Sequence, residues 1–195
     1  MTSRCRVLLV SGSLRSGSTN TALLRTVQSV APDGIGTVLY DGLGRLPHFD
    51  PDRDRDPLPP PVAALRAEVR TSHAILFCTP EYAGALPGSF KNLLDWTIGD
   101  DHPGSIYEKP VAWINASAAP TGAADAHASL RTVLGYAHAT VVEDACVSIP
   151  VTRQMVGGAG LVDVSTIHGQ ILHALTVLAV HAGGSRGASA DSTTG

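Results

Sequence analysis

Short apolar runs alternate with segments of helical periodicity along most of the chain. The first run, residues 4–10 (RCRVLLV), ends just before Gly12, as a buried parallel strand does. Further strands are expected at residues 37–40, 74–79, 111–115 and 139–149. Helices are expected at residues 19–31, 62–72, 87–98, 125–138 and 166–182. This alternation predicts a parallel sheet with helices on both faces.

Three unusual loops follow the first, third and fourth expected strands. They span residues 12–20, 79–87 and 115–125. In an open parallel sheet, ligands bind beyond the carboxyl ends of the strands, at the point where the strand order switches. The three loops are therefore expected to meet at one edge and to form the functional site.

The chain has 195 residues, of which 44% are hydrophobic, so it can build one substantial core. No repeat or internal linker separates two parts. We expect residues 1–182 to form a single domain. Residues 183–195 (GGSRGASADSTTG) lack large apolar side chains and are expected to be a disordered tail.

Charge and composition argue against nucleic acid, secretion and a membrane span, and a cytoplasmic location is expected. The net charge is −3 and no long basic run occurs, which argues against nucleic acid. No secretion signal is recognised, and the most apolar segment, residues 171–182, is too short for a bilayer. The three cysteines are far apart and odd in number, as expected of buried thiols in a reducing compartment.

The first loop has the spacing of a phosphate-binding loop without its lysine. Gly12 and Gly17 stand at that spacing, but Ser18 occupies the position of the lysine that a nucleoside-triphosphate loop needs. Leu14 breaks the dinucleotide pattern GxGxxG. Free amides at a helix start, hydroxyls and one arginine suit a single phosphate held without metal. A serine-rich turn that only caps the helix is the alternative. The candidate ligands are Ser13, Arg15, Ser16, Ser18, Thr19 and Asn20.

The second loop, TPEYAGALPGSF, is stiff and has exposed backbone. Pro80 and Pro87 restrict it, and Gly84 permits close backbone approach. Such a loop can lie along the edge of a flat ring. Glu81 offers an acceptor there, and Tyr82 can pack on the ring or on a partner subunit. The alternatives are that Glu81 caps local amides and that Tyr82 is ordinary surface.

Three motifs together resemble the NADPH-dependent FMN reductase family, the flavodoxin-like group that includes bacterial quinone, chromate and azo reductases. They are GSLRSGSTN, LPHFDPD and PEYAGALPGSFKNLLDW, after the first three expected strands. The resemblance covers residues 7–142, and the paired first and third motifs are specific. It implies a flavodoxin-like, doubly wound, five-stranded parallel sheet in the order 2-1-3-4-5, with FMN bound. It also implies a homodimer or homotetramer with flavin sites near the subunit interface.

The resemblance assigns cofactor-binding roles by position. The family's phosphate-loop positions carry Ser13, Arg15, Ser18 and Asn20, with Thr19 among them. The isoalloxazine loop carries Pro80, Glu81 and Tyr82, followed by Ala83 and Gly84, and the third loop contributes Ser117 and Gly122. Many members have Asn and then a bulky residue where Ala83 and Gly84 stand. The smaller residues either widen the acceptor pocket or weaken flavin binding. Residues 153–160 (RQMVGGAG) have no recognised counterpart.

The implied activity is hydride transfer from NADPH or NADH, through FMN, to a quinone, azo, metal-oxyanion or flavin acceptor by ping-pong kinetics. The flavin carries the chemistry, so no catalytic side chain is expected. Backbone amides of residues 80–84 are expected to stabilise the reduced flavin. Two alternatives remain open: a flavodoxin-like electron carrier without NAD(P)H turnover, and a binding module that has lost its flavin.

No metal site is expected. The eight histidines form neither HExxH nor a zinc pattern with cysteine. The acidic segment 50–56 (DPDRDRD) lacks the central glycine and distal glutamate of a calcium loop. His48, in the LPHFDPD motif, is the one histidine expected near the site. Trp96 is expected in the core or in a subunit interface, and Lys91 is expected to pair with Asp95.

Overall fold

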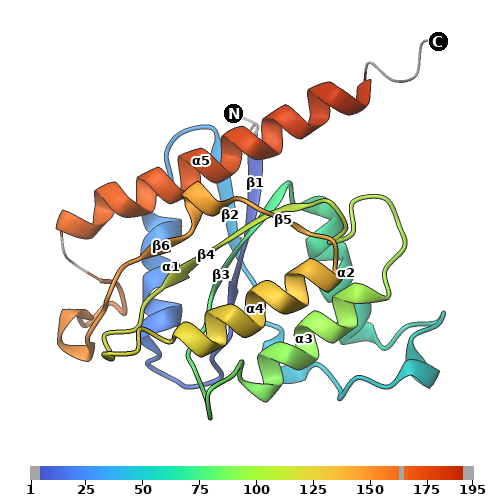
Figure 1. Ribbon diagram of the computed structural model, residues 1–195, viewed down its shortest axis with the longest axis horizontal. Coiled ribbons are helices and arrows are strands. Elements are labelled where there is room, and N and C mark those ends of the chain that lie inside the picture. The colour runs from blue at the N-terminus through green and yellow to red at the C-terminus, as the bar shows by residue number, and fades with distance from the viewer. Residues whose placement is uncertain (1–4, 163–164, 191–195) are drawn as a thin grey trace.

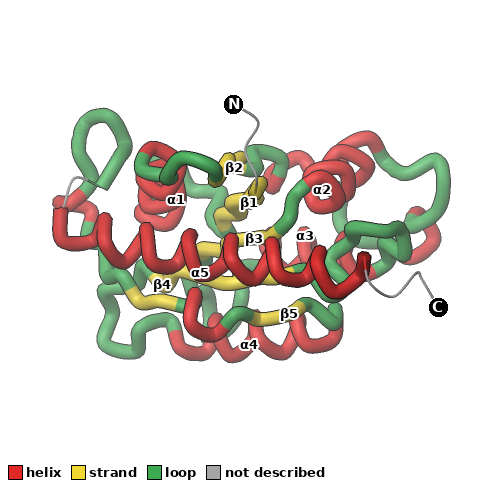
Figure 2. Tube along the Cα trace, turned by 90° about the horizontal axis from the view of Figure 1, so that it is seen from above, coloured by secondary structure: helices red, strands yellow, loops and turns green. Residues whose placement is uncertain are grey.

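The fold is built on a parallel sheet with the strand order β2-β1-β3-β4-β5, and a short β6 also pairs with β4 (Figures 1 and 2). The computed structural model describes residues 5–162 and 165–190. The strands are β1 (Cys5–Ser11), β2 (Ile35–Leu39), β3 (Ala74–Cys78), β4 (Pro110–Asn115), β5 (Thr140–Val141) and β6 (Val147–Ser148). This is the flavodoxin-like order, so the predicted fold is confirmed.

Helices cover both faces of the sheet, as predicted. They are α1 (Thr19–Ser29), α2 (Pro60–Thr71), α3 (Gly88–Ile98), α4 (Ala124–Tyr136) and α5 (Ser165–Ala190). The side chains of successive β1 residues point to opposite faces of the sheet. Val7 and Leu9 pack with α1 and α5, while Leu8 and Val10 pack with α2, α3 and α4. Because the centre of β1 is buried on both faces, residues 7–10 are all apolar rather than alternating with polar residues.

The segment 139–149, which was expected to carry the fifth strand, contains two short strands instead of one. They are β5 and β6, with a 3₁₀ turn, Glu143–Ala145, between them. Two consecutive acidic residues, Glu143 and Asp144, interrupt the apolar run and remain exposed. Glu143 forms an ion pair with Arg131 on α4 at the surface. The chain therefore leaves the sheet for one turn to keep these carboxylates in water and then pairs with β4 again.

Most helix ends lie within one or two residues of those expected, and two of the differences are informative. α2 begins at Pro60 instead of residue 62, because proline is tolerated in the first turn of a helix, where no amide hydrogen bond is lost. α5 continues past residue 182 to Ala190, so the expected tail begins inside this helix. Residues 191–195 of that tail lie outside the described residues. No helix in the described ranges is both long enough and apolar enough to cross a bilayer.

The acidic loop between β2 and α2 is tied to the core by a buried arginine. Arg66 is 5% exposed, and its guanidinium donates to Asp54 Oδ1 over 2.6 Å and to the Trp96 carbonyl over 2.9 Å. Trp96 is fully buried and donates its indole N–H to the Pro47 carbonyl. The expectation of a core position for Trp96 is confirmed. The LPHFDPD segment is thus fixed against α3.

Candidate functional site

A cavity of about 330 Å³ lies at the carboxyl ends of β1, β3 and β4. The start of α1 and the loops after β3 and β4 form its walls. The predicted site residues on these walls are Thr19, Asn20, Pro80, Glu81 and Ser117. The cavity therefore lies where the three loops were expected to meet, at the switch point of the strand order.

The start of α1 presents unbonded amides beside the cavity. Ser18 is the N-cap, and its hydroxyl accepts from the Thr21 amide at 3.5 Å. Within the described part of the chain, the amides of Thr19 and Asn20 have no acceptor. Gly17 has a φ of +69°, the left-handed conformation that turns the loop into the helix. Two free amides at the positive end of a helix dipole form an anion site.

Close approach of the first two loops requires glycine at position 12. A Cβ atom on Gly12 would lie 2.3 Å from the Thr79 hydroxyl oxygen, inside van der Waals contact. The Gly12 amide also donates to the Cys78 carbonyl over 2.9 Å. The first and second loops therefore leave the sheet in direct contact.

Cys78 orients the Asn20 side chain from below the cavity. The thiol is fully buried and donates to Asn20 Oδ1 over 3.2 Å. Burial raises the pKa of the Cys78 thiol, so it keeps its proton and remains a donor. Because Oδ1 is engaged, the Nδ2 group of Asn20 is the part of this side chain left to bind a ligand.

The second loop makes a two-residue turn beyond the cavity. Tyr82 and Ala85 exchange backbone hydrogen bonds of 3.0 and 3.1 Å. Ala83 and Gly84 between them have φ values of +51° and +69°, the pattern of a type I′ turn. Tyr82 is 53% exposed, and none of these three predicted site residues, Tyr82, Ala83 and Gly84, lines the cavity.

Glu81, by contrast, extends from this loop to α4. Its Oε2 accepts from the Ala126 amide over 3.0 Å. Ala126 is the third residue of α4, and the helix has no side-chain cap of its own because Ala123 is its N-cap. Glu81 thus caps a helix that is remote in sequence instead of local amides.

Asn115, the last residue of β4, organises the third loop. Its Oδ1 accepts from the Ser117 amide over 2.9 Å, and its Nδ2 donates to the Gly122 carbonyl. Gly122 and Ala123 both have left-handed φ values, +60° and +53°. Ser117 therefore stands on the cavity wall, whereas Gly122 shapes the backbone that turns into α4.

Ser13, Arg15 and Ser18 precede α1 in the first loop, and none of them lines the cavity. The half-buried Ser13 accepts from the Arg15 amide at 3.2 Å, while the Arg15 side chain is exposed. His48 is also exposed and does not line the cavity.

Several residues that line the cavity were not predicted from the sequence, among them Thr79, Ala116, Thr121, Ala123 and Val151. Thr79 closes the expected third strand, so its place at the strand end could have been noticed. Nothing in the sequence around Val151 indicates that it lines a cavity. It lies there because its amide donates to the Ala116 carbonyl over 3.0 Å.

A buried neutral histidine lies beside the cavity on α4. His127 is 8% exposed, its Nδ1 donates to the Ala123 carbonyl over 2.7 Å, and its ring lies 5.9 Å from that of Trp113. Its Nε2 is buried and has no hydrogen-bond partner in the described ranges. Burial lowers the pKa of His127, more than the Ala123 hydrogen bond and the Glu81 carboxylate raise it.

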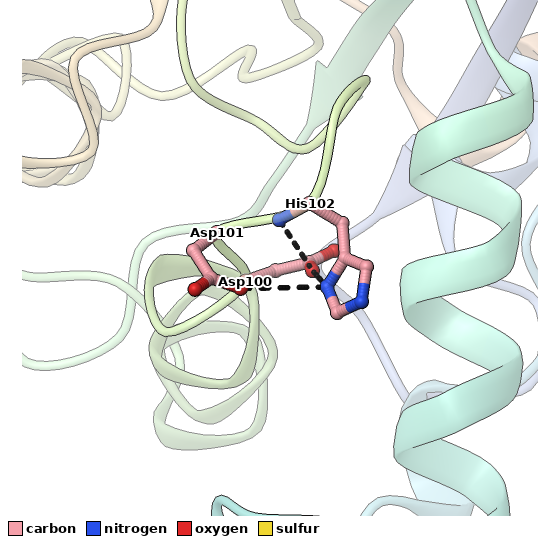
Figure 3. A group of neighbouring side chains, drawn as sticks. All are labelled: Asp100, Asp101 and His102. Atoms are coloured by element: carbon pink, nitrogen blue, oxygen red, sulfur yellow. Dashed lines mark hydrogen bonds and ion pairs between the residues drawn. The ribbon is translucent and has the colours of Figure 1, made fainter.

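A separate group of polar side chains, Asp100, Asp101 and His102, follows α3 (Figure 3). It lies in the segment leading to the amino end of β4, at the opposite end of the sheet from the cavity. His102 Nδ1 is 3.0 Å from Asp100 Oδ1, and Arg70 Nε is 3.5 Å from Asp100 Oδ2. The buried carboxylate is thus already balanced by Arg70, and this group does not by itself define a metal site.

Comparisons with known proteins agree with this architecture. The family model for NADPH-dependent FMN reductase matches residues 5–154. An NAD(P)H-dependent FMN reductase of Pseudomonas aeruginosa is 38% identical over 135 residues, which are 69% of this chain and 71% of that protein. A quinone reductase of Escherichia coli K12 is 31% identical over 144 residues, 73% of this chain and 76% of that protein.

A solved structure extends the similarity to nearly the whole chain. FerB, a flavoenzyme NAD(P)H:(acceptor) oxidoreductase from Paracoccus denitrificans, superposes with a TM-score of 0.78 and 28% identity. The match covers 91% of this chain and 98% of FerB. The family match includes the strands, helices and loops that form the cavity. The chain therefore belongs to the NADPH-dependent FMN reductase family.

Proposed function

We propose that this protein is an FMN-dependent NAD(P)H oxidoreductase that reduces small-molecule acceptors of the quinone class. The observation that carries the proposal is the pair of unbonded amides at the start of α1, beside a cavity at the switch point of the sheet. The cavity volume falls within the range of ligand pockets. The family match supplies the chemical class.

The residues present fit a flavin mononucleotide. The amides of Thr19 and Asn20 would bind its phosphate with help from the helix dipole, and the exposed Arg15 would add a positive charge. The backbone around Pro80 and the wall at Ser117 would hold the ring between them, and Asn20 Nδ2 would donate to it. When bound, FMN supplies the hydride-accepting and hydride-donating centre.

In this proposal the protein binds and orients the cofactor and the substrates, and no side chain of the cavity has to transfer a proton. Among the residues that line the cavity, Glu81 alone has an acidic or basic side chain, and its carboxylate is engaged by the Ala126 amide. We therefore assign no general acid or base. In this proposal the nicotinamide and the acceptor bind in turn at the same face of the flavin, which is a ping-pong order. Azo compounds, metal oxyanions and free flavin are further acceptors to test.

The test begins with the absorbance spectrum of the purified protein, before and after incubation with FMN and desalting. Flavin bands that survive desalting are expected. NADPH and NADH oxidation with menadione should then give parallel double-reciprocal lines. Protein that remains colourless after reconstitution would contradict the proposal. Yellow protein without NAD(P)H turnover would favour the electron carrier.

We also propose a homodimer or homotetramer located in the cytoplasm. A second subunit that packed on the first two loops of the site would bury Leu14 and Tyr82, which are more than half exposed in the single chain. No two cysteines form a disulfide in the part of the chain that the structure describes, as expected in a reducing compartment. Light scattering coupled to size-exclusion chromatography measures the assembly, and cell fractionation the location.

A further inference from the structure

Glu81 connects two walls of the cavity, the loop after β3 and the start of α4. It lines the cavity on the loop after β3, and its carboxylate accepts from Ala126 on the far side of the loop after β4. The two residues are 45 positions apart in the chain. This contact therefore sets how the loop after β3 lies relative to the start of α4.

The start of α4 depends on this contact because its own sequence cannot cap it. An N-cap side chain normally accepts from the amide of the second or third helical residue, and Ala123 has no atom that can do so. The Ala124 amide is satisfied by the Thr121 carbonyl, and the Ala126 amide by Glu81. The carboxylate also lies at the positive end of the α4 dipole, where a negative charge is favourable.

The backbone on the α4 side of this contact is strained. Ala123 lines the cavity with a φ of +53°, in a region that alanine adopts only at a cost. Such strain persists only where the surroundings determine the conformation. The hydrogen bond from Ala126 to Glu81 and that from Asn115 to Gly122 lie on either side of Ala123 and hold it in place.

We propose that Glu81 is a positioning residue for the cofactor: its carboxylate, by accepting the Ala126 amide, fixes the spacing between the loop after β3 and the start of α4. This inference rests on the proposed FMN site and deepens it. Glu81 then acts through the position of the cavity walls and not through direct contact with the flavin. This role depends on a side chain long enough to place an acceptor oxygen at the Ala126 amide, and it does not depend on the negative charge.

Two conservative variants separate reach from charge. Glu81→Gln keeps an acceptor oxygen at the same distance and loses the charge. Glu81→Asp keeps the charge but is one methylene too short to reach Ala126. Asp125→Asn is the matched control, because Asp125 is an exposed carboxylate in the same first turn of α4 that does not line the cavity.

The measurements are the FMN dissociation constant from flavin fluorescence, the visible spectrum of the bound flavin, and the melting temperature of the flavin-free protein. E81D is expected to bind FMN about tenfold more weakly, with an altered visible spectrum, because the contact is lost. E81Q is expected to stay within about threefold of wild type, since a neutral acceptor keeps the contact at roughly half its strength. D125N is expected to bind FMN like wild type.

The outcomes distinguish this inference from the proposed function. If wild-type protein takes up no FMN, the proposed function fails and the inference fails with it. If wild type binds FMN and E81D binds equally tightly, the positioning role alone is overturned. If E81Q is weakened as much as E81D, the charge is what matters, and the positioning role is likewise overturned. A lower melting temperature in E81D without a change in FMN affinity would show only a structural cap.

Discussion

Alanine in a left-handed conformation marks both loops that flank the cavity. Ala83 lies at the first central position of the turn after Tyr82, where asparagine is strongly preferred. Ala83→Asn is therefore expected to raise the free energy of unfolding by about 0.5–1 kcal/mol, because a left-handed alanine costs about 1–2 kcal/mol that asparagine largely avoids. Urea unfolding followed by circular dichroism measures the change at constant m-value.

The neighbouring Ala85 provides the control for that variant. It closes the same turn but is not among the residues with positive φ. Ala85→Asn should therefore give no stabilisation. Equal stabilisation by both variants would show that strain at Ala83 is not the cause.

Arg15 is the exposed cation on the phosphate loop, and the structure gives its side chain no role in the fold. Its side chain makes no hydrogen bond or ion pair within the described ranges, so Arg15→Ala should leave the melting temperature of the flavin-free protein unchanged. FMN affinity should fall about tenfold at low salt, because one charge-assisted contact to phosphate is removed. The loss should shrink as salt screens the exposed charge.

Arg25, on α1 but further from its start, is the matched control for Arg15. Titration of FMN into R15A and R25A at two salt concentrations separates a phosphate contact from a general effect of net charge. Unchanged affinity in R15A, or equal loss in both variants, would remove Arg15 from the site.

At the scale of the element, α4 carries a titratable group near its positive end. Burial lowers the pKa of His127 in the folded protein, so the unfolded chain binds its proton more readily. The contribution of His127 to stability is fully present above about pH 6.5, the ordinary value. It is lost as the pH falls from there through the lowered folded pKa. Glu81 is the charged group that faces His127, and it reduces the shift without reversing it.

Wild-type protein should accordingly lose more unfolding free energy between pH 7.5 and pH 5 than His127→Asn, which has no titrating ring. The control is His138→Asn, because His138 is exposed just beyond the other end of α4 and asparagine tolerates its φ of +52°. H138N should follow the wild-type pH dependence. If H127N also follows it, His127 is not the group responsible.

At the scale of the whole molecule, FMN should stabilise the fold, because it binds the native state and not the unfolded chain. At a hundredfold excess over the dissociation constant the gain is about 2.7 kcal/mol. For a chain of this size, that gain corresponds to a rise in melting temperature of roughly 5–10 °C. Differential scanning fluorimetry, or calorimetry where flavin fluorescence interferes, measures it.

Riboflavin separates the phosphate site from the ring site, since it has the same ring and no phosphate. At equal concentration it should raise the melting temperature much less than FMN, because it cannot use the amides of Thr19 and Asn20. Equal shifts would mean that the start of α1 does not bind the phosphate. Inorganic phosphate alone should give a small shift of its own.

The sequence by itself determined the layered architecture and the edge of the sheet that carries the site. Runs such as residues 4–10 must be buried on both faces, and helices of one-sided periodicity must cover them, so local pattern suffices for both. The first loop could also be predicted from the sequence, because glycine at positions 12 and 17 and polar residues before a helix are local signals. The strand order and the cofactor came from the resemblance of three motifs to a family.

Only the tertiary structure decided which of these residues share a cavity. Glu81 with Ala126, Cys78 with Asn20, and Val151 with Ala116 are contacts between segments far apart in the chain. Periodicity and turn chemistry describe the backbone within a few residues, so they hold no information about such pairs. The interruption of the fifth strand was missed because the residues on either side of it suit a strand, whereas the exposed ion pair of Glu143 with Arg131 is a contact between segments far apart in the chain.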